Sequence, residues 1–193
     1  MLHLCGKSPY KNTTALLEAW KIHPEWPKLT CIGRKHILGK ASASASNIEL
    51  ITDFLSEDDL ETLMNRNPIH ICPSRFEGFE HYMNEARSTG AVVLYGDARP
   101  MNEFFEDGVN GIALGGKVRK EKRKGIQIDS YTPSLNDFEK GLRRLLGMSS
   151  PERWEMGQQA RQAYLRDKGD FTYRWKKFVQ SNYMQEPLNH KIT

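Results

Sequence analysis

Short apolar runs alternate with amphipathic stretches along residues 1–114 of the chain. The apolar runs have the length and the continuous hydrophobicity of strands that are buried on both faces of a sheet. Strands are expected at residues 2–6, 29–33, 48–51, 69–72, 91–95 and 112–114. Helices are expected between them at residues 13–21, 56–65, 80–88 and 101–106. This alternation predicts an α/β fold, in which crossover helices flank a parallel sheet.

Two of these helices are preceded by residues that favour helix starts. Asn12 stands before the helix at 13–21, and Ser56 stands before the acidic residues Glu57, Asp58 and Asp59. Asn and Ser side chains accept hydrogen bonds from the free N–H groups of a first helical turn. We therefore expect an N-cap at Asn12 and another at Ser56.

The pattern changes after residue 114. Residues 117–124 carry many charges, and residues 35–46 contain Gly39 and an alternation of Ala and Ser, so we interpret both segments as surface loops. Apolar residues at helical spacing predict helices at 135–146, 151–166 and 171–183. The chain is accordingly divided into one α/β domain, residues 1–150, and C-terminal helices, residues 151–193, that pack on it.

Composition narrows the class of protein. Hydrophobic residues make up 38% and charged residues 27%, which is typical of a soluble globular domain. The net charge of +4 suits an anionic ligand such as a nucleoside diphosphate, or weak attraction to an anionic membrane. It is too small to indicate a specific nucleic-acid partner. Cys5, Cys31 and Cys72 lie in apolar runs, so we expect buried thiols and a reducing, cytoplasmic location.

The clearest chemical signal follows the strand at 69–72. Ligands of open α/β sheets bind beyond the carboxyl ends of such strands. Gly78 allows close approach of the backbone to a ligand, and the helix after it offers N–H groups that attract phosphate. Glu77 and Glu85 can accept hydrogen bonds from the hydroxyls of a sugar. Taken alone, the two residues are better explained as solvated surface acids.

The segment from Pro73 to Ala86 resembles the Glu-x7-Glu motif of retaining glycosyltransferases of family 4. Its first part reads Pro73-Ser-Arg-Phe-Glu-Gly-Phe79, and the second Glu of the motif is Glu85. Residues 97–103 are similar to the Pro-x-x-Glu stretch of that family, and residues 107–111 to its Asp-Gly-x-Asn-Gly turn. The resemblance covers about residues 2–114. It implies the Rossmann-like, donor-binding C-terminal half of the GT-B fold, with extra C-terminal helices.

The resemblance also assigns roles to residues of the motif. In that family the first Glu lies beside the transferred sugar and the next backbone amides help to bind it, which points to Glu77, Gly78 and Phe79. The second Glu binds the ribose hydroxyls, which points to Glu85. Arg75 and Glu103 are further candidates for donor binding.

The loop at residues 6–12 is similar to the first loop of the family, where two basic side chains grip the donor diphosphate. Lys7 and Lys11 stand at these positions, after Gly6. Two ammonium groups near a helix start can neutralise a diphosphate leaving group. Lys7, Lys11 and Glu77 are therefore the catalytic candidates, and Gly6 is a donor-binding one. No metal and no cofactor besides the nucleotide-sugar are expected. Alone, two loop lysines are usually just solvated.

The sequence departs from the family in two respects. Glu80 stands where the family usually has Gly, and its side chain can crowd and repel the donor phosphates or act as a favourable charge in the first helical turn. The chain also matches only one of the two Rossmann-like domains of a GT-B enzyme. A partner chain, a fragment of a longer enzyme and a subunit without catalysis are the three explanations.

The expected function is transfer of a sugar from a nucleotide-sugar to an unidentified acceptor, with retention of anomeric configuration. The first alternative is a non-catalytic nucleotide-sugar-binding subunit that needs a partner acceptor domain. The second is a basic module centred on residues 117–124 that contacts acidic lipids or nucleic acid. Peripheral membrane contact remains open for the enzyme as well.

Overall fold

The computed structural model of the chain describes residues 1–38, 45–78 and 81–183. Six parallel strands form the main sheet, in the order β3-β2-β1-β4-β5-β6. They are β1 (Leu2–Gly6), β2 (Leu29–Gly33), β3 (Ile48–Ile51), β4 (Ile69–Cys72), β5 (Val92–Gly96) and β6 (Ile112–Leu114). The predicted Rossmann-like α/β fold is confirmed, and all six strands lie within one residue of the expected positions.

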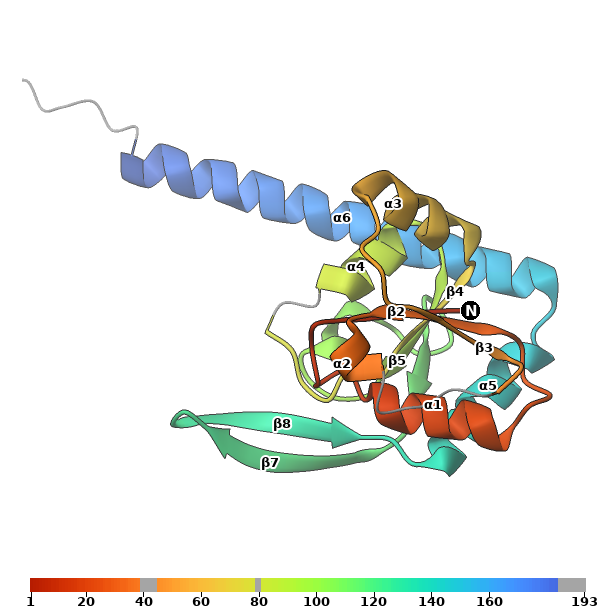
Figure 1. The fold of residues 1–193 in the computed structure, drawn as a ribbon. Helices are drawn as coiled ribbons and strands as arrows, with labels where there is room; N and C mark the ends of the chain where they lie inside the picture. Colours follow the sequence, from red (N-terminus) through yellow and green to blue (C-terminus); the bar gives the residue numbers. More distant parts are fainter. Residues whose placement is uncertain (39–44, 79–80, 184–193) are drawn as a thin grey trace, which may run out of the picture.

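Helices cover both faces of the sheet (Figure 1). α1 (Thr13–Ile22) and α5 (Leu135–Gly147) lie on one face, and α3 (Glu57–Arg66), α4 (His81–Ser88) and the first part of α6 (Ser150–Tyr183) lie on the other. The short α2 (Lys35–Leu38) follows β2, and the 3-10 helix η1 (Met101–Phe104) follows β5. Trp20 of α1 and Phe138 of α5 are fully buried in the core between these layers.

The order of the strands creates a switch point between β1 and β4. From β1 the chain builds the sheet outward through β2 and β3, and it then returns to add β4 on the other side of β1. The loops that leave β1 and β4 therefore diverge, which is where ligands bind in open α/β sheets. The loop after β1 is residues 7–12, and the loop after β4 begins at Pro73.

A buried histidine joins the two central strands beneath these loops. The Nδ1 of His3 donates to the carbonyl oxygen of Ile71 in β4 over 2.8 Å, and the hydroxyl of Thr13 donates to its Nε2 over 2.9 Å. Burial lowers the pKa of His3 to about 4, because a charged ring is poorly solvated there. A neutral imidazole thus ties β1, β4 and the start of α1 together.

The C-terminal part is one helix, α6, where the sequence predicted two. Its first part packs closely on the domain: a Cβ at Gly157 would lie 2.1 Å from the carbonyl oxygen of Gly90. The break was predicted near Gly169, but an exposed helical Gly costs only about 1 kcal/mol and does not end the helix. Beyond that point several aromatic side chains are exposed, namely Phe171, Tyr173, Trp175 and Phe178.

The interpretation of residues 117–124 as a loop was wrong. They form β7 (Lys117–Arg123), which pairs antiparallel with β8 (Ile126–Thr132) as a hairpin separate from the main sheet (Figure 1). Lys124 and Gly125 both have positive φ, 48° and 84°, as a tight two-residue hairpin turn requires. Residues 35–38 are likewise helical and not a loop, and residues 39–44 lie outside the described residues.

One of the two predicted caps is confirmed. The side chain of Ser56 accepts a hydrogen bond from the backbone N–H of Asp59 over 3.1 Å. The prediction for Asn12 was wrong: it makes no side-chain cap hydrogen bond and adopts a left-handed conformation. Its amide instead donates to backbone carbonyl groups on two other segments.

All three cysteines are free and buried, as expected. None of the helices within residues 1–38, 45–78 and 81–183 is long and apolar enough to span a membrane.

Candidate functional site

The loops that follow β1 and β4 are bonded to each other at the switch point. The backbone N–H of Arg75 donates to the carbonyl oxygen of Tyr10 over 2.7 Å. The Asn12 amide donates to the carbonyl oxygen of Pro73, also over 2.7 Å. The rings of Tyr10 and Phe76 lie with their centroids 4.6 Å apart. These contacts hold the two loops in a fixed relation before any ligand binds.

Lys11 and Glu77 meet across this junction. Their side chains form an ion pair and are only 12% and 20% exposed. The ammonium group also lies 3.9 Å from the centre of the Tyr82 ring on α4, a cation–π contact. The structure thus brings together two of the three catalytic candidates, one from each loop, as a partly buried pair of opposite charges.

Lys7, the third catalytic candidate, faces a different hollow. Together with Gly6 it lines a space of about 180 Å³, whose other walls include Arg34 and Asp53 from the β2 and β3 side. Gly6 has a φ of 55°, which favours glycine, and a Cβ there would meet no neighbour. Lys7 and Lys11 therefore lie in the same loop but do not line one common hollow.

Glu85 lies exposed on α4 between two hollows. One, of about 520 Å³, is shared with α3, and the other, of about 490 Å³, is shared with α6 and includes Phe104 and Tyr164. Glu103 is exposed on η1 and forms an ion pair with Arg99 over 3.7 Å. Neither carboxylate lines the hollow beside Glu77.

Among the described residues, no heavy atom beyond the two chain neighbours of Gly78 lies within 4 Å of the position of an added Cβ. The role of Gly78 in donor binding stays a prediction. Phe79 and Glu80 lie outside the described residues, so the role of Phe79 and the effect of Glu80 stay predictions.

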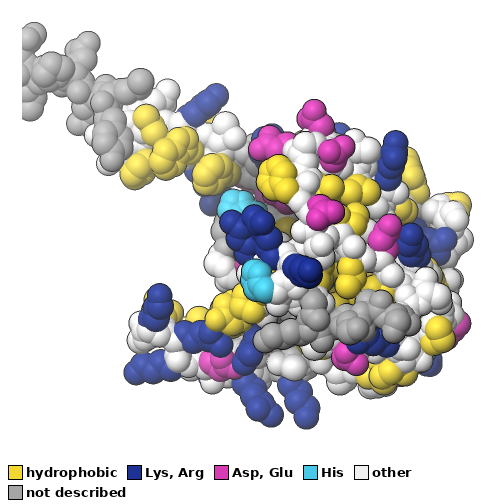
Figure 2. All heavy atoms as spheres, in the orientation of Figure 1, with side chains coloured by type: hydrophobic (Ala, Val, Ile, Leu, Met, Phe, Trp, Pro, Cys, Tyr) yellow, Lys and Arg dark blue, Asp and Glu magenta, His cyan; other side chains and the backbone are white. Residues whose placement is uncertain are grey.

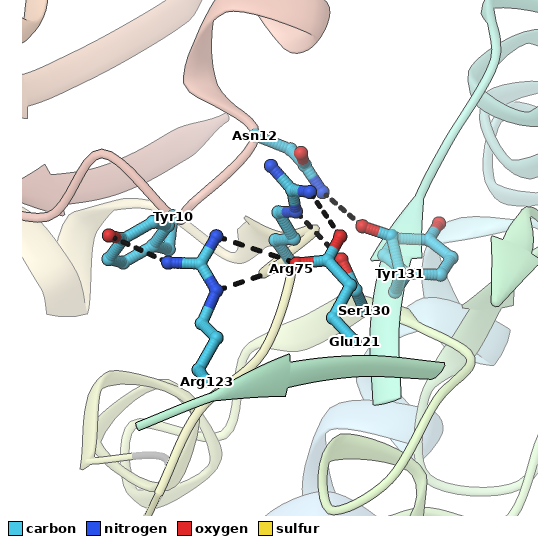
Figure 3. Close-up of polar contacts among 7 residues, drawn as sticks. All are labelled: Tyr10, Asn12, Arg75, Glu121, Arg123, Ser130 and Tyr131. Carbon is cyan, nitrogen blue, oxygen red and sulfur yellow. Dashed lines mark hydrogen bonds and ion pairs between the residues drawn. The ribbon is translucent and has the colours of Figure 1, made fainter. Parts of the chain in front are cut away.

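Arg75 connects the loop after β4 to the hairpin (Figure 3). Its Nε donates to the Ser130 hydroxyl over 2.7 Å, and its guanidinium forms an ion pair with Glu121. Hydrogen bonds from Ser130 and Arg75 hold the pKa of Glu121 below its ordinary value, so that this carboxylate stays charged. In this structure the donor-binding candidate Arg75 therefore positions the loop against β7 and β8.

Arg123 makes a second connection from the hairpin to both loops (Figure 3). Its guanidinium donates to the Tyr10 hydroxyl over 3.0 Å. The same group lies 4.8 Å from the centre of the Tyr10 ring and 4.7 Å from that of Phe76. Arg123 thus covers the aromatic pair that joins the two loops.

Tyr131 anchors the base of the hairpin. Its ring is fully buried. A Cβ added at Gly96 or at Gly116 would lie 2.7 Å or less from a carbon atom of this ring. Its hydroxyl donates to the carbonyl oxygen of Gly115 over 2.9 Å. Its backbone N–H donates to the carbonyl oxygen of Arg75 over 2.7 Å. The tight contacts at both glycines show how closely β8 is fitted to the sheet edge.

The hairpin closes one side of a hollow next to Glu77. This space of about 270 Å³ is lined by the loop after β4, by the turn at Arg99 and Pro100, and by both strands of the hairpin. Figure 2 shows that this face of the molecule is hollowed between the hairpin and the projecting part of α6, and that Lys and Arg side chains gather over the hairpin. No group of three or more His, Cys, Asp or Glu side chains within the described ranges could hold a metal ion.

The sequence comparison places this geometry in a known family. The family model described as Glycosyl transferases group 1 matches residues 2–123, from β1 to the end of β7 and more than half of the chain. The chain belongs to this family. The matched range contains both loops of the switch point, with Lys11 and Glu77. No curated protein sequence matches the chain at a significant level.

Solved glycosyltransferases share the fold. The C-terminal domain of the group 1 glycosyl transferase LpcC from Francisella tularensis superposes with a TM-score of 0.62 at 18% identity, covering 86% of this chain and 84% of that one. HepE from Anabaena, in complex with UDP, gives 0.70 at 15% identity, covering 93% and 48%. The pneumococcal O-GlcNAc transferase GtfA, in complex with UDP and GlcNAc, gives 0.63 at 18% identity, covering 93% and 35%.

These similarities show the fold of the glycosyltransferase chain. The chain spans less than half the length of HepE and about a third of GtfA. It corresponds in extent to the C-terminal domain of LpcC.

Sequence reasoning missed the contribution of the hairpin to this site. Residues 126–129 alternate apolar and polar side chains, Ile-Gln-Ile-Asp, which is a signal for a strand. Lys124-Gly125 before them is a plausible tight turn, but the run of charges in residues 117–124 dominated the interpretation. The contacts of Arg123 with Tyr10 and Phe76 had no signal in the sequence at all.

Proposed function

We propose that this glycosyltransferase chain binds a nucleotide-sugar at the junction of the loops after β1 and β4, and that it forms the donor half of a retaining sugar transfer. The observation that carries the proposal is the Lys11–Glu77 ion pair at the switch point of a group 1 family member. A cation for the diphosphate and a carboxylate for the sugar are thereby held side by side.

Lys11 is proposed to bind the diphosphate. A partly buried ammonium group needs a counter-ion, because desolvation of an unpaired charge is costly. Glu77 supplies it. A bound diphosphate offers a second and stronger anion at the start of α1, where free N–H groups add to the attraction. Lys7 is proposed to reach the same phosphates from the hollow lined by Gly6.

Glu77 is proposed to act on the sugar. When the bond between the sugar C1 and the diphosphate oxygen breaks, its electron pair leaves with the diphosphate and positive charge develops on the ring. A carboxylate next to the ring stabilises that charge, and the lysines offset the negative charge of the leaving group. Glu85 is proposed to accept hydrogen bonds from the ribose hydroxyls, with Gly78, Phe79, Arg75 and Glu103 as further donor-binding residues. These electrostatic roles require no metal ion.

Uridine nucleotides are the first ligands to test. HepE and GtfA, which share the fold, were both solved with UDP, and HepE also with UDP-glucose. Calorimetry of the purified chain with UDP, GDP and ADP tests the proposal directly. We expect binding of at least one of them, with the same affinity in EDTA and in Mg²⁺. Failure of all three to bind would reject the proposal.

Turnover distinguishes an enzyme from a binding subunit. The second candidate function is a nucleotide-sugar-binding subunit whose acceptor domain lies on a partner chain. Release of free sugar from the preferred nucleotide-sugar, measured with the chain alone, favours the enzyme. Binding without any release favours the subunit.

Contact with an anionic membrane is proposed as an accessory property of the hairpin. Lys117, Arg119, Lys122 and Lys124 are exposed there, and so is Ile126 beside the turn. A cluster of four cations attracts acidic lipid head groups at about 1 kcal/mol per residue. An apolar residue beside the turn can add contact with the lipid boundary.

A further inference from the structure

The hollow beside Glu77 has a wall that the family match does not reach. Glu77 and Phe76 line it from the loop after β4, whereas Gln127 and Asp129 line it from β8. The match to the family model ends at residue 123, before β8 begins at Ile126. The hairpin therefore adds polar groups of its own directly beside the motif glutamate.

Two hydrogen bonds between Arg75 and β8 fix the position of this strand relative to the loop that carries Glu77. Arg75, two residues before Glu77, donates from its Nε to Ser130, the neighbour of Asp129, over 2.7 Å. The carbonyl oxygen of Arg75 accepts from the backbone N–H of Tyr131 over 2.7 Å. The loop and the strand therefore form one connected unit, and a ligand in the hollow meets an arrangement that already exists.

The side chains in the hollow suit a polyol. Asp129 is 19% exposed and forms an ion pair with Lys120 on the opposite strand of the hairpin. Glu77, on the other wall of the hollow, is likewise paired with a lysine, Lys11. Each carboxylate can accept a hydroxyl hydrogen bond, and the amide of Gln127 can donate or accept one. Phe76 adds an apolar surface of the kind that packs against the C–H groups of a sugar ring.

The size of the hollow fits one sugar ring. Its volume of about 270 Å³ lies just below the range for pockets that hold drug-sized ligands, about 300–1,000 Å³. A complete nucleotide-sugar needs more space than this. The hollow therefore suits the sugar, with the nucleotide outside it.

We propose that β8 forms a wall of the sugar subsite and that Asp129, assisted by Gln127, selects the transferred sugar by hydrogen bonding to its ring hydroxyls. The inference rests on the proposed function, because it needs a nucleotide-sugar bound with its sugar next to Glu77. It adds a determinant of sugar specificity that lies on the hairpin and outside the matched part of the chain.

The test compares the affinity for a nucleotide with the affinity for its sugar conjugates. Calorimetry is run with UDP and with its glucose, galactose and N-acetylglucosamine conjugates, and with GDP and GDP-mannose. The variants are Asp129→Asn and Gln127→Ala, with Lys124→Ala as a control in the hairpin turn. We expect wild type to bind one conjugate at least tenfold more tightly than its parent nucleotide. In Asp129→Asn we expect the ratio of conjugate affinity to nucleotide affinity to fall about tenfold, and in Gln127→Ala we expect a smaller fall. The affinity of both variants for the nucleotide itself should not change. The control Lys124→Ala should keep both wild-type affinities.

The outcomes separate the two proposals. Nucleotide binding with the same sugar preference in wild type, Asp129→Asn and Gln127→Ala overturns the inference and leaves the proposed function standing. The inference is also overturned by a wild-type chain that binds all conjugates no better than their nucleotides. A wild-type chain that binds none of UDP, GDP and ADP removes the basis of both. Gln127 is exposed, so its variant reports on the subsite even where Asp129→Asn fails to fold.

Discussion

At the scale of single residues, charged groups of the candidate site are paired with partners from another segment. Lys11 pairs with Glu77 between the two loops, and Arg75 pairs with Glu121 between a loop and the hairpin. Residue types and the family motif are enough to select Lys11 and Glu77 as candidates. They do not reveal the pairing, because the two residues are far apart in the chain and meet only through the parallel order of β1 and β4.

Asn12 and Arg75 illustrate what residue types leave undecided. Asn is a good N-cap, yet its amide here donates to Pro73 and to Tyr131, which lie 61 and 119 residues away. Arg75 was a donor-binding candidate, and its guanidinium is already engaged by Ser130 and Glu121. In both cases at least one partner lies in a hairpin that the sequence interpretation had not predicted.

Replacing Glu85 with Ala tests its proposed role at the ribose. A charged hydrogen bond contributes about 1.5–3 kcal/mol, so we expect UDP affinity to fall by about 10- to 150-fold. Glu61→Ala is the matched control, because Glu61 is exposed on α3 and lines the same hollow as Glu85. Calorimetry gives both affinities. Equal affinities of wild type and Glu85→Ala would remove Glu85 from the nucleotide site.

Acid should destabilise the fold through its buried histidines. Burial lowers the pKa of His3 and of His70 to about 4, whereas an unfolded His titrates near about 6.5. Between these values the unfolded chain binds more protons, so stability is lost as the pH falls. Each of these two histidines lowers the free energy of unfolding by at most about 1.4 kcal/mol for each pH unit of acidification in that window.

Urea unfolding between about pH 7 and about pH 5.5 measures this dependence. The variant His3→Asn keeps a side-chain donor near the carbonyl oxygen of Ile71 but cannot titrate. We expect a shallower loss of stability in the variant than in wild type. The same slope in both chains would mean that His3 does not stay neutral in the folded state.

At the scale of elements, hydrophobic periodicity predicted the sheet and its helices but not the hairpin or the length of α6. β1 to β6 belong to a sheet with helices on both faces, so their sequences are mostly apolar. β7 carries charged side chains on both faces because it is not part of the main sheet and is open to solvent. Its position depends on Arg123, Glu121 and Tyr131, whose contacts with distant segments leave no periodic pattern.

The attachment of α6 depends on a buried charge. The Arg87 side chain of α4 is 1% exposed and pairs with Asp167 of α6 over 2.6 Å. Asp167→Ala leaves this guanidinium buried without its main counter-ion, so we expect a loss of about 1–3 kcal/mol in the free energy of unfolding by urea. Asp170→Ala, an exposed position one turn further along α6, should change stability little. A neutral effect of Asp167→Ala would show that α6 is held by apolar packing alone.

The hairpin should mediate any binding to acidic membranes. Vesicles with one third phosphatidylserine, about the composition of an anionic leaflet, are sedimented with wild type and with the double variant Lys122→Glu and Lys124→Glu. We expect a large loss of bound protein in the variant and weaker binding of wild type at high salt. A second double variant, Lys28→Glu with Lys140→Glu, is the control, because it changes the net charge by the same amount outside the hairpin. Equal losses in both double variants would show that net charge, and not the hairpin, attracts the membrane.

At the scale of the whole molecule, the Rossmann-like fold and the place of the site in it could be predicted. Alternating strands and helices lead to a parallel sheet, and such sheets bind ligands at a switch point. The hollow that the hairpin closes could not be predicted, since it combines residues 76–77, 99–100 and 120–129. The structure therefore adds to the motif a third wall, which the sequence did not indicate.

The most direct test of the central claim is an NMR titration of the ¹⁵N-labelled chain with UDP. We expect the largest amide shift changes at residues 6–12, 74–78 and 81–88, the loops of the switch point and the helix that follows. Saturable changes confined to these segments would support a nucleotide site between β1 and β4. Changes centred elsewhere, such as on the distal part of α6, or no changes with UDP, GDP and ADP in turn, would contradict it.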